Sequence, residues 1–322
     1  MRHAVALTLA GVILFGAASS LPAAEPWPDH TVKFIVPFGA GAGADIGARL
    51  FADRLSTRWG RPVVVENRPG GDGFVAITAF VGANDDHTLL FAAAGSFTVH
   101  PYQHDKLPYD IRDLVPIARV SNTIITVGVP AAMKLGSLAD LVALARAQPG
   151  KLNAALVPGI TEFVWDGFVN EAKLDFAKVP YRDIVQAGTD LGEGRIQAMM
   201  TGLAVIQAQV QAGRVKLLAV TNRKRAVSYP DVPTAVEAGF PALEVEGLVG
   251  LFGPRIMSAE LRERIAADVA AVGTDPTVIA RLTATAQVVN PGGPAEFAAA
   301  IDEQRAKMAV IAQRLGIKAA GQ

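Results

Sequence analysis

The chain is organised around residues 32–60, which read VKFIVPFGAGAGADIGARLFADRLSTRWG. The first five residues are mostly apolar and β-branched and predict a strand, and the run Gly39-Ala40-Gly41-Ala42-Gly43 predicts a tight turn. A helix is expected over 45–59, because apolar residues recur on one side of it (Ile46, Leu50 and Leu55), and Gly60 ends it. The segment therefore predicts a strand, a glycine turn and a helix in direct succession.

The same alternation continues along the chain. The residue patterns predict further strands at 62–66, 88–93, 123–129, 152–157, 176–179, 196–200 and 215–220, and further helices at 74–81, 137–148, 258–272 and 294–315. Strands that alternate with helices are typical of an α/β fold in which helices flank a mainly parallel sheet. No linker rich in proline and glycine divides the chain, so we expect two lobes joined by more than one crossing.

Composition narrows the class of function. The chain has 322 residues, 51% of them hydrophobic, and 30 basic residues balance 30 acidic ones. This neutral balance disfavours nucleic acid or an anionic membrane surface as a partner. Cysteine is absent, which excludes disulfides, a thiolate nucleophile and cysteine-ligated metals.

The first 24 residues have the pattern of a signal peptide. Arg2 supplies a positive charge, residues 4–18 form an apolar run, and small residues follow. The run is shorter than the roughly 20 residues that a membrane span needs. Cleavage after Ser20 and cleavage after Ala24 both fit. We therefore expect an exported, periplasmic protein.

The glycine turn has three readings. Gly39, Gly41 and Ala44 fit a loose form of the dinucleotide fingerprint, and Glu66 ends the next strand, where a ribose-binding acid would lie. Glycines that open a helix also favour a carboxylate or a phosphate, because free amides point at the ligand. A tight turn without a ligand is the third reading. Asp45, in the first helical turn, fits a cap as well as a ligand contact.

Other chemistry finds little support in the sequence. His100, His104 and Asp105 would lie close together on a helix, but Pro101 and Pro108 favour a loop there, so we predict no metal. A nucleophile elbow of the form G-x-S-x-G is missing, and neither Glu244 and Glu246 nor the basic run 223–225 departs from a solvated surface. The sequence therefore predicts a protein that is not an enzyme and that needs no cofactor.

Several motifs, taken in order, resemble one family. They are VPF at 36–38 with its glycine turn, VVENRPG at 64–70, KLPYD at 106–110, PGKLN at 149–153, VPY at 179–181, AGRV at 212–215, LAVT at 218–221, PDVPT at 230–234 and EAG at 237–239. The chain is similar to the Bug, or TctC-like, family of periplasmic solute-binding proteins, which serve tripartite tricarboxylate transporters.

The resemblance implies a two-lobed Venus flytrap fold, with the ligand between the lobes. Lobe 1 would comprise 25–126 and 221–322, and lobe 2 would comprise 127–220, with crossings at 123–129 and 215–220. Carried over by position, the ligand-binding residues are Phe38, Gly39, Ala40, Gly41, Ala42, Gly43, Asp45, Ser96 and Thr98 in lobe 1, and Gly159, Ile160, Thr161, Tyr181, Arg182 and Thr201 in lobe 2.

Some positions depart from the family pattern. Ala40-Gly41-Ala42 stands where the family has Pro-Gly-Gly, Arg182 stands where it has lysine, and Thr201 stands where it has aspartate. Arg182 fits a bidentate pair with a carboxylate and equally a surface pair with Asp183. Apolar residues near 160–165 suggest a longer or aromatic acid.

The sequence thus predicts a monomeric periplasmic protein that captures a small organic acid for a tripartite tricarboxylate transporter. Two alternatives stay open. One is an exported α/β enzyme or dinucleotide-dependent oxidoreductase that uses the 39–44 turn. The other is a ligand sensor that partners a signalling protein.

Overall fold

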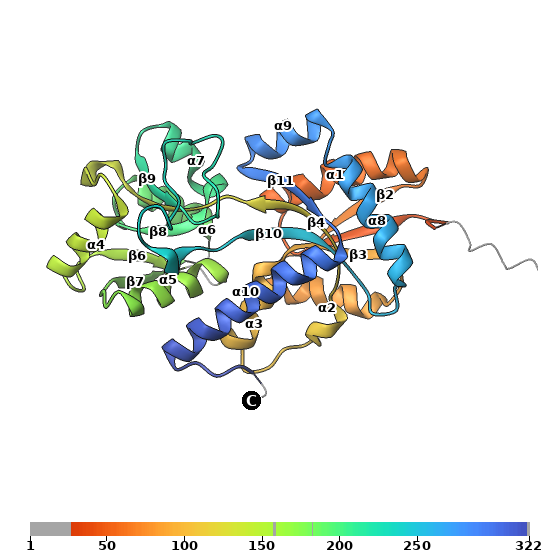
Figure 1. The fold of residues 1–322 in the computed structure, drawn as a ribbon, viewed down its shortest axis with the longest axis horizontal. Coiled ribbons are helices and arrows are strands. Elements are labelled where there is room, and N and C mark those ends of the chain that lie inside the picture. The colour runs from red at the N-terminus through yellow and green to blue at the C-terminus, as the bar shows by residue number, and fades with distance from the viewer. Residues whose placement is uncertain (1–26, 157–158, 182, 321–322) are drawn as a thin grey trace, which may run out of the picture.

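A computed structural model describes residues 27–156, 159–181 and 183–320, and shows two groups of sheets side by side (Figure 1). The larger group is one six-stranded sheet with the order β11-β4-β10-β3-β1-β2. Its strands are β1 (Val32–Val36), β2 (Val63–Asn67), β3 (Thr88–Ala93), β4 (Val115–Thr123), β10 (Gly247–Gly253) and β11 (Gln287–Gly292). We call this sheet, with the helices packed on it, lobe 1. Those helices are α1 (Gly43–Trp59), α2 (Phe74–Ala83), α3 (Ala94–Gln103), α8 (Ala259–Val272), α9 (Pro276–Ala284) and α10 (Pro294–Leu315).

Lobe 2 contains two smaller sheets, with the orders β8-β5-β9 and β6-β7. The strands are β5 (Ile125–Pro130), β6 (Asn153–Leu156), β7 (Ala177–Pro180), β8 (Met199–Gly202) and β9 (Val215–Val220). The helices are α4 (Leu138–Ala147), α5 (Ile160–Glu171), α6 (Ile184–Gly192) and α7 (Leu203–Gln211). The two-lobed α/β fold expected from the sequence is confirmed.

The sheets are mixed, whereas the sequence predicted mainly parallel ones. β1 pairs in parallel with β2 and β3, but β10 runs antiparallel to β3 and β4, and β5 runs antiparallel to β8 and β9. The antiparallel strands lie next to the segments that connect the two lobes. The chain leaves lobe 1 along β4 and returns to it along β10. A connection that returns in this way reverses the strand direction, which a repeated strand–helix pattern does not reveal.

The first crossing between the lobes is not the continuous strand that was predicted. The single strand expected at 123–129 is two strands, because β4 ends at Thr123 and β5 begins at Ile125 in a different sheet. The return follows β9, through the segment 221–246, into β10. The lobe boundaries at 126 and 220 stay a prediction.

Three predictions about local structure were wrong. The loops that the sequence suggested at 95–98 and around Pro101 lie inside α3, and Ile160 and Thr161, also expected in a loop, begin α5. Pro101 is tolerated because it is near the carboxyl end of a short helix, where only one backbone hydrogen bond of that helix is lost. Strands β4, β10 and β11 were not predicted.

The long helix α10 contributes to both lobes. Phe297 and Ile301, near its start, lie in the core beside the six-stranded sheet, whereas Met308 and Ile311 lie in the core of lobe 2. Helix α10 therefore forms a third link between the lobes (Figure 1). In the part of the chain that the structure describes, no helix is both long and apolar enough to span a membrane.

Candidate ligand-binding cleft

The side chain of Asp45 stabilises the glycine turn through hydrogen bonds. Its carboxylate is 2% exposed and accepts hydrogen bonds from the amide of Gly41 (2.8 Å) and from the side chains of Asn67 (2.7 Å) and Arg49 (3.1 Å). Burial alone would raise the pKa of Asp45, but these bonds outweigh it and lower the pKa. Asn67 also donates to the carbonyl of Phe38 at 2.9 Å. The carboxylate of Asp45 therefore fixes the turn, and the protein itself occupies its acceptor positions.

A cavity of about 180 Å³ opens beside this turn in lobe 1. Two predicted ligand residues, Phe38 and Ser96, line it. Gly70, Asp72 and Gly73 also line it, and they were not in the predicted set. They form the turn NRPGGDG at 67–73, whose glycines were visible in the sequence as a second turn like the first.

Helix N-termini gather at this edge of the six-stranded sheet. Strands β2, β1 and β3 are neighbours and parallel, so the helices α2, α1 and α3 that follow them begin at the same edge. Their N-cap residues are Gly73, Ala42 and Ala93, and none makes a side-chain cap. In doubly wound folds this edge is where ligands bind.

Lobe 2 repeats the arrangement. Strands β6 and β8 run parallel through a bridge at Ala154 and Ala198, so α5 and α7 also begin at one edge. Gly159 and Gly202 precede these helices and cap neither of them. In contrast, Ser137, Asp183, Ser258 and Asp275 cap α4, α6, α8 and α9 with their side chains. Helix α10 also begins after an uncapped glycine, with proline at its first position.

The two edges meet where α3 faces α5. A Cβ atom added at Gly95 would lie 2.9 Å from Cγ2 of Ile160, and the rings of Tyr102 and Phe163 stack with centroids 5.6 Å apart. The side chain of Gln103 donates to the carbonyl of Gly159 at 3.4 Å. The structure thus brings the predicted loops at 95–98 and 159–161 together, from different lobes.

Two other predicted residues make hydrogen bonds within the protein, and a third is buried without one. The hydroxyl of Thr98 is buried and donates to the carbonyl of Gly95 (2.8 Å). Tyr181 donates to Asp190 (2.7 Å), and burial together with this bond raises its pKa to about 12. Thr201 is fully buried, and its hydroxyl has no hydrogen-bond partner among the described residues. Arg182 and the signal segment lie outside the described residues.

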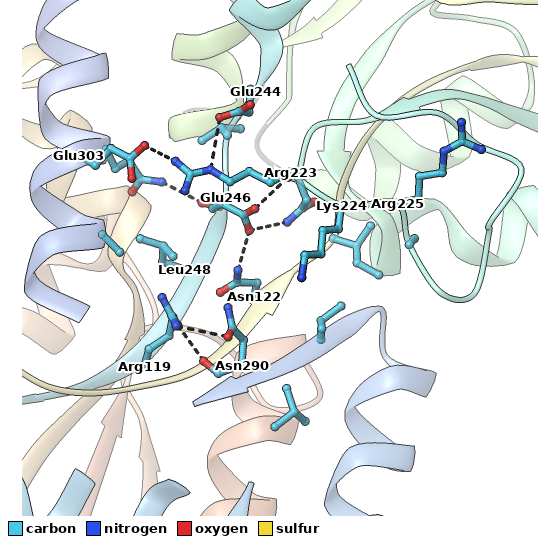
Figure 2. A pocket seen from close by; sticks show the side chains of 18 of the residues that line it. Arg119, Asn122, Arg223, Lys224, Arg225, Glu244, Glu246, Leu248, Asn290 and Glu303 are labelled. Carbon is cyan, nitrogen blue, oxygen red and sulfur yellow. Dashed lines mark hydrogen bonds and ion pairs between the residues drawn. The ribbon is translucent and has the colours of Figure 1, made fainter. Parts of the chain in front are cut away.

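A second cavity, of about 470 Å³, lies at the crossings, and none of the predicted ligand residues that the structure describes lines it (Figure 2). There the side chain of Asn222 accepts from the amide of Ile125 (2.9 Å) and donates to the carbonyl of Thr123 (3.0 Å). Glu246 accepts from Asn122, Asn222 and the amide of Arg223. These bonds tie the two crossings together.

The basic run 223–225 lies exposed in a loop, as the sequence predicted, whereas the interpretation of Glu246 as solvated surface was wrong. Glu246 is half-buried and accepts three hydrogen bonds, and Arg223 forms ion pairs with Glu244 and Glu303, as Figure 2 shows. In the sequence, Glu244 and Glu246 alternate with an apolar residue, which is typical of a solvated face. Their interactions were not predictable, because the partner residues come from distant parts of the chain.

The fold and the paired edges define a periplasmic binding protein. The known protein BugD, a periplasmic binding protein, superposes with a TM-score of 0.76 and 25% identity, over 91% of this chain and 99% of that one. Residues 47–317 match the Tripartite tricarboxylate transporter family receptor. The chain belongs to this family of solute-binding proteins, the Bug or TctC family.

Further relatives extend the comparison. A UPF0065 protein of Bordetella bronchiseptica is 30% identical, over 97% of this chain and 93% of that protein. The structure of R. palustris Rpa4515 with adipate has a TM-score of 0.79 and 26% identity, and covers 91% of this chain and 99% of that one. Another structure, MatC from Rhodopseudomonas palustris with bound malate, has a TM-score of 0.75 and 25% identity, over 88% of this chain and 99% of that one.

Proposed function

We propose that this protein is exported to the periplasm, captures a small organic acid between its lobes, and delivers it to a tripartite tricarboxylate transporter. The observation that carries the proposal is the meeting of uncapped helix N-termini from the two lobes at Gly95 and Ile160. Free amides at such termini, together with the helix dipole, favour a carboxylate. The adipate and malate bound to two relatives support the same class of ligand.

A ligand that contacts both lobes would hold them closed. A ligand can hold the closed state only if it binds that state better than the open one, by contacting both lobes. A dicarboxylate satisfies this requirement, because each end can accept hydrogen bonds from one lobe. The predicted residues Gly39–Gly43, Ser96, Thr161 and Arg182 belong to this proposed site, as does the adjoining 70–73 turn.

A thermal-shift assay tests the proposal. The protein without its first 24 residues is unfolded and refolded to remove bound ligand, and is then screened against mono-, di- and tricarboxylates, aromatic acids and NAD(H). A ligand at a hundred times its dissociation constant adds about 2.7 kcal/mol to the free energy of unfolding, a shift of several degrees. We expect a shift with one class of acid and none with its methyl ester, which lacks the charge. A shift with NAD(H) alone, or equal shifts with acid and ester, would contradict the proposal.

The contact at Gly95 gives a second prediction. In the Gly95→Ala variant the added methyl group meets Ile160, so closure is strained and acid affinity falls about tenfold, a cost near 1.4 kcal/mol. Isothermal titration calorimetry measures the change. Replacing Ile160 with alanine in the same variant removes the clash and is expected to restore most of the affinity.

Gly82 provides the matched control. It lies inside α2, and a Cβ there would have nothing within 4 Å in the described part of the chain. Gly82→Ala is therefore expected to leave acid affinity unchanged and to raise stability by about 1 kcal/mol. Equal affinity for Gly95→Ala and Gly82→Ala would show that the two lobes do not close on the ligand at Gly95.

A further inference from the structure

Two histidines and an aspartate meet beside the lobe 1 cavity. His100 lies on α3, and His104 follows one turn later, its amide donating to the carbonyl of His100 at 3.1 Å. Asp72 comes from the turn between β2 and α2 and has a φ of 55°, in the left-handed region. A helix with Pro101 inside it brings these side chains together, whereas the loop that the prolines favoured in the sequence gave no reason to predict a metal there.

The distances suit one metal ion. Oδ2 of Asp72 lies 3.0 Å from Nε2 of His104 and 3.5 Å from Nε2 of His100, and the three ligand atoms lie within 4.8 Å of one another. Ligands about 2.0–2.1 Å from a tetrahedral zinc ion are roughly 3.3 Å apart. The two measured distances to Asp72 are close to that separation, so an ion requires only small side-chain movements.

His100 is the residue that most needs a partner. Its side chain is 0% exposed, and its Nε2 atom, which faces Asp72, makes no hydrogen bond within the described ranges. The other ring nitrogen, Nδ1, lies 2.8 Å from the hydroxyl of Tyr109, itself a buried residue. When Nδ1 donates its proton to that hydroxyl, Nε2 carries a lone pair toward Asp72. A histidine held in this way by a second partner is the usual arrangement of a metal ligand.

The surroundings of the cluster keep it in place. The ring of Phe74 lies edge-on to both imidazoles, with centroids 4.8 Å from His100 and 4.7 Å from His104. Asp72 lines the cavity that also contains Phe38 and Ser96. The two imidazoles therefore pack against the ring of Phe74, and Asp72 reaches the cavity.

We propose that Asp72, His100 and His104 bind a divalent transition-metal ion of the zinc type. Two imidazoles and one carboxylate are a donor set that zinc accepts, and three protein ligands leave a fourth position for water or another oxygen ligand. The proposal goes beyond acid capture, because the three side chains bind the ion whether or not an acid is present.

Zinc titration of the leaderless protein tests the site. The sample carries no polyhistidine tag, is treated with a chelator, and is titrated calorimetrically in a buffer free of carboxylates. We expect one site per chain with a dissociation constant of about 1 μM or below. Loss of one ligand in His104→Ala is expected to weaken binding by at least about 100-fold, since even outer partners of ligands contribute 10- to 100-fold. His104 is partly exposed, so this variant is expected to fold, which circular dichroism verifies.

A second cluster supplies the control. Asp29, His30 and His87 also lie within ligand distance of one another, but His30 and Asp29 are largely exposed. His30→Ala is expected to leave the zinc affinity unchanged, and Tyr109→Phe to lower it about tenfold, because His100 loses its orienting partner. Absence of zinc binding at 100 μM, unchanged binding by His104→Ala, or loss of binding by His30→Ala would each overturn the proposal.

Discussion

Replacing Asp45 with alanine is expected to lower the free energy of unfolding by about 3 kcal/mol and to abolish acid binding. The substitution leaves the amide of Gly41 and the side chains of Asn67 and Arg49 without their acceptor. The amide of Asn67 also holds the carbonyl of Phe38, so the whole 38–43 turn loses its support. Chemical denaturation measures the stability, and the thermal-shift assay with the acid measures the binding.

The same carboxylate predicts how stability depends on pH. Because folding lowers the pKa of Asp45, its contribution is present above the unfolded value of about 4 and is lost as the pH falls through the folded pKa. The Asp45→Ala variant should therefore lose less stability than the natural protein as the pH falls below about 4. Asp53, on the same helix with a largely exposed side chain, is the control, and Asp53→Ala is expected to change stability by less than about 1 kcal/mol. Equal effects of the two substitutions would show that Asp45 does not support the turn.

Replacing Gly250 with alanine is expected to destabilise the protein by about 3 kcal/mol or more, the upper end of the cost of overpacking. The added Cβ would lie 2.5 Å from the ring of Phe297 and closer still to the carbonyl oxygen of Ala118. The ring can move, but the carbonyl belongs to β4, the paired neighbour of β10, and cannot move without breaking the sheet. The Tm should fall by about 6 °C or more.

A second substitution separates the two clashes. In Gly250→Ala with Phe297→Leu, the smaller side chain relieves the contact with the helix but not the contact with Ala118. We therefore expect at most a partial recovery of Tm. Full recovery would show that β4 and β10 can separate at this point. The close approach of the two strands would then not explain why residue 250 is a glycine.

Sequence patterns predicted the elements that form from neighbouring residues. The strand, turn and helix at 32–59 were found because their apolar spacing and glycines lie within one short segment. Strand β10 has glycines at 247, 250 and 253, which weakened its pattern, and Gly250 is required by the carbonyl of Ala118 and the ring of Phe297, both distant in sequence. Tertiary packing therefore determined this strand, and a single sequence does not show it.

The residues of the candidate site could be predicted only where they lie in sequence motifs shared with the family. Residues 38–43 and 95–98 were assigned to the site by resemblance, and the structure places Phe38 and Ser96 on one cavity. Thr98 and Tyr181 were assigned by position, and internal hydrogen bonds occupy both. Asp72 was missed because its partners, His100 and His104, come from another strand–helix unit.

The packing of α10 also determines when the chain can fold. Ile311 packs against Gly167, and Phe297 packs against Gly250, so residues near the carboxyl terminus complete the cores of both lobes. Contacts between residues so far apart in sequence slow folding and make it depend on the last part of the chain to be synthesised. A chain without α10 therefore lacks part of the hydrophobic core in each lobe.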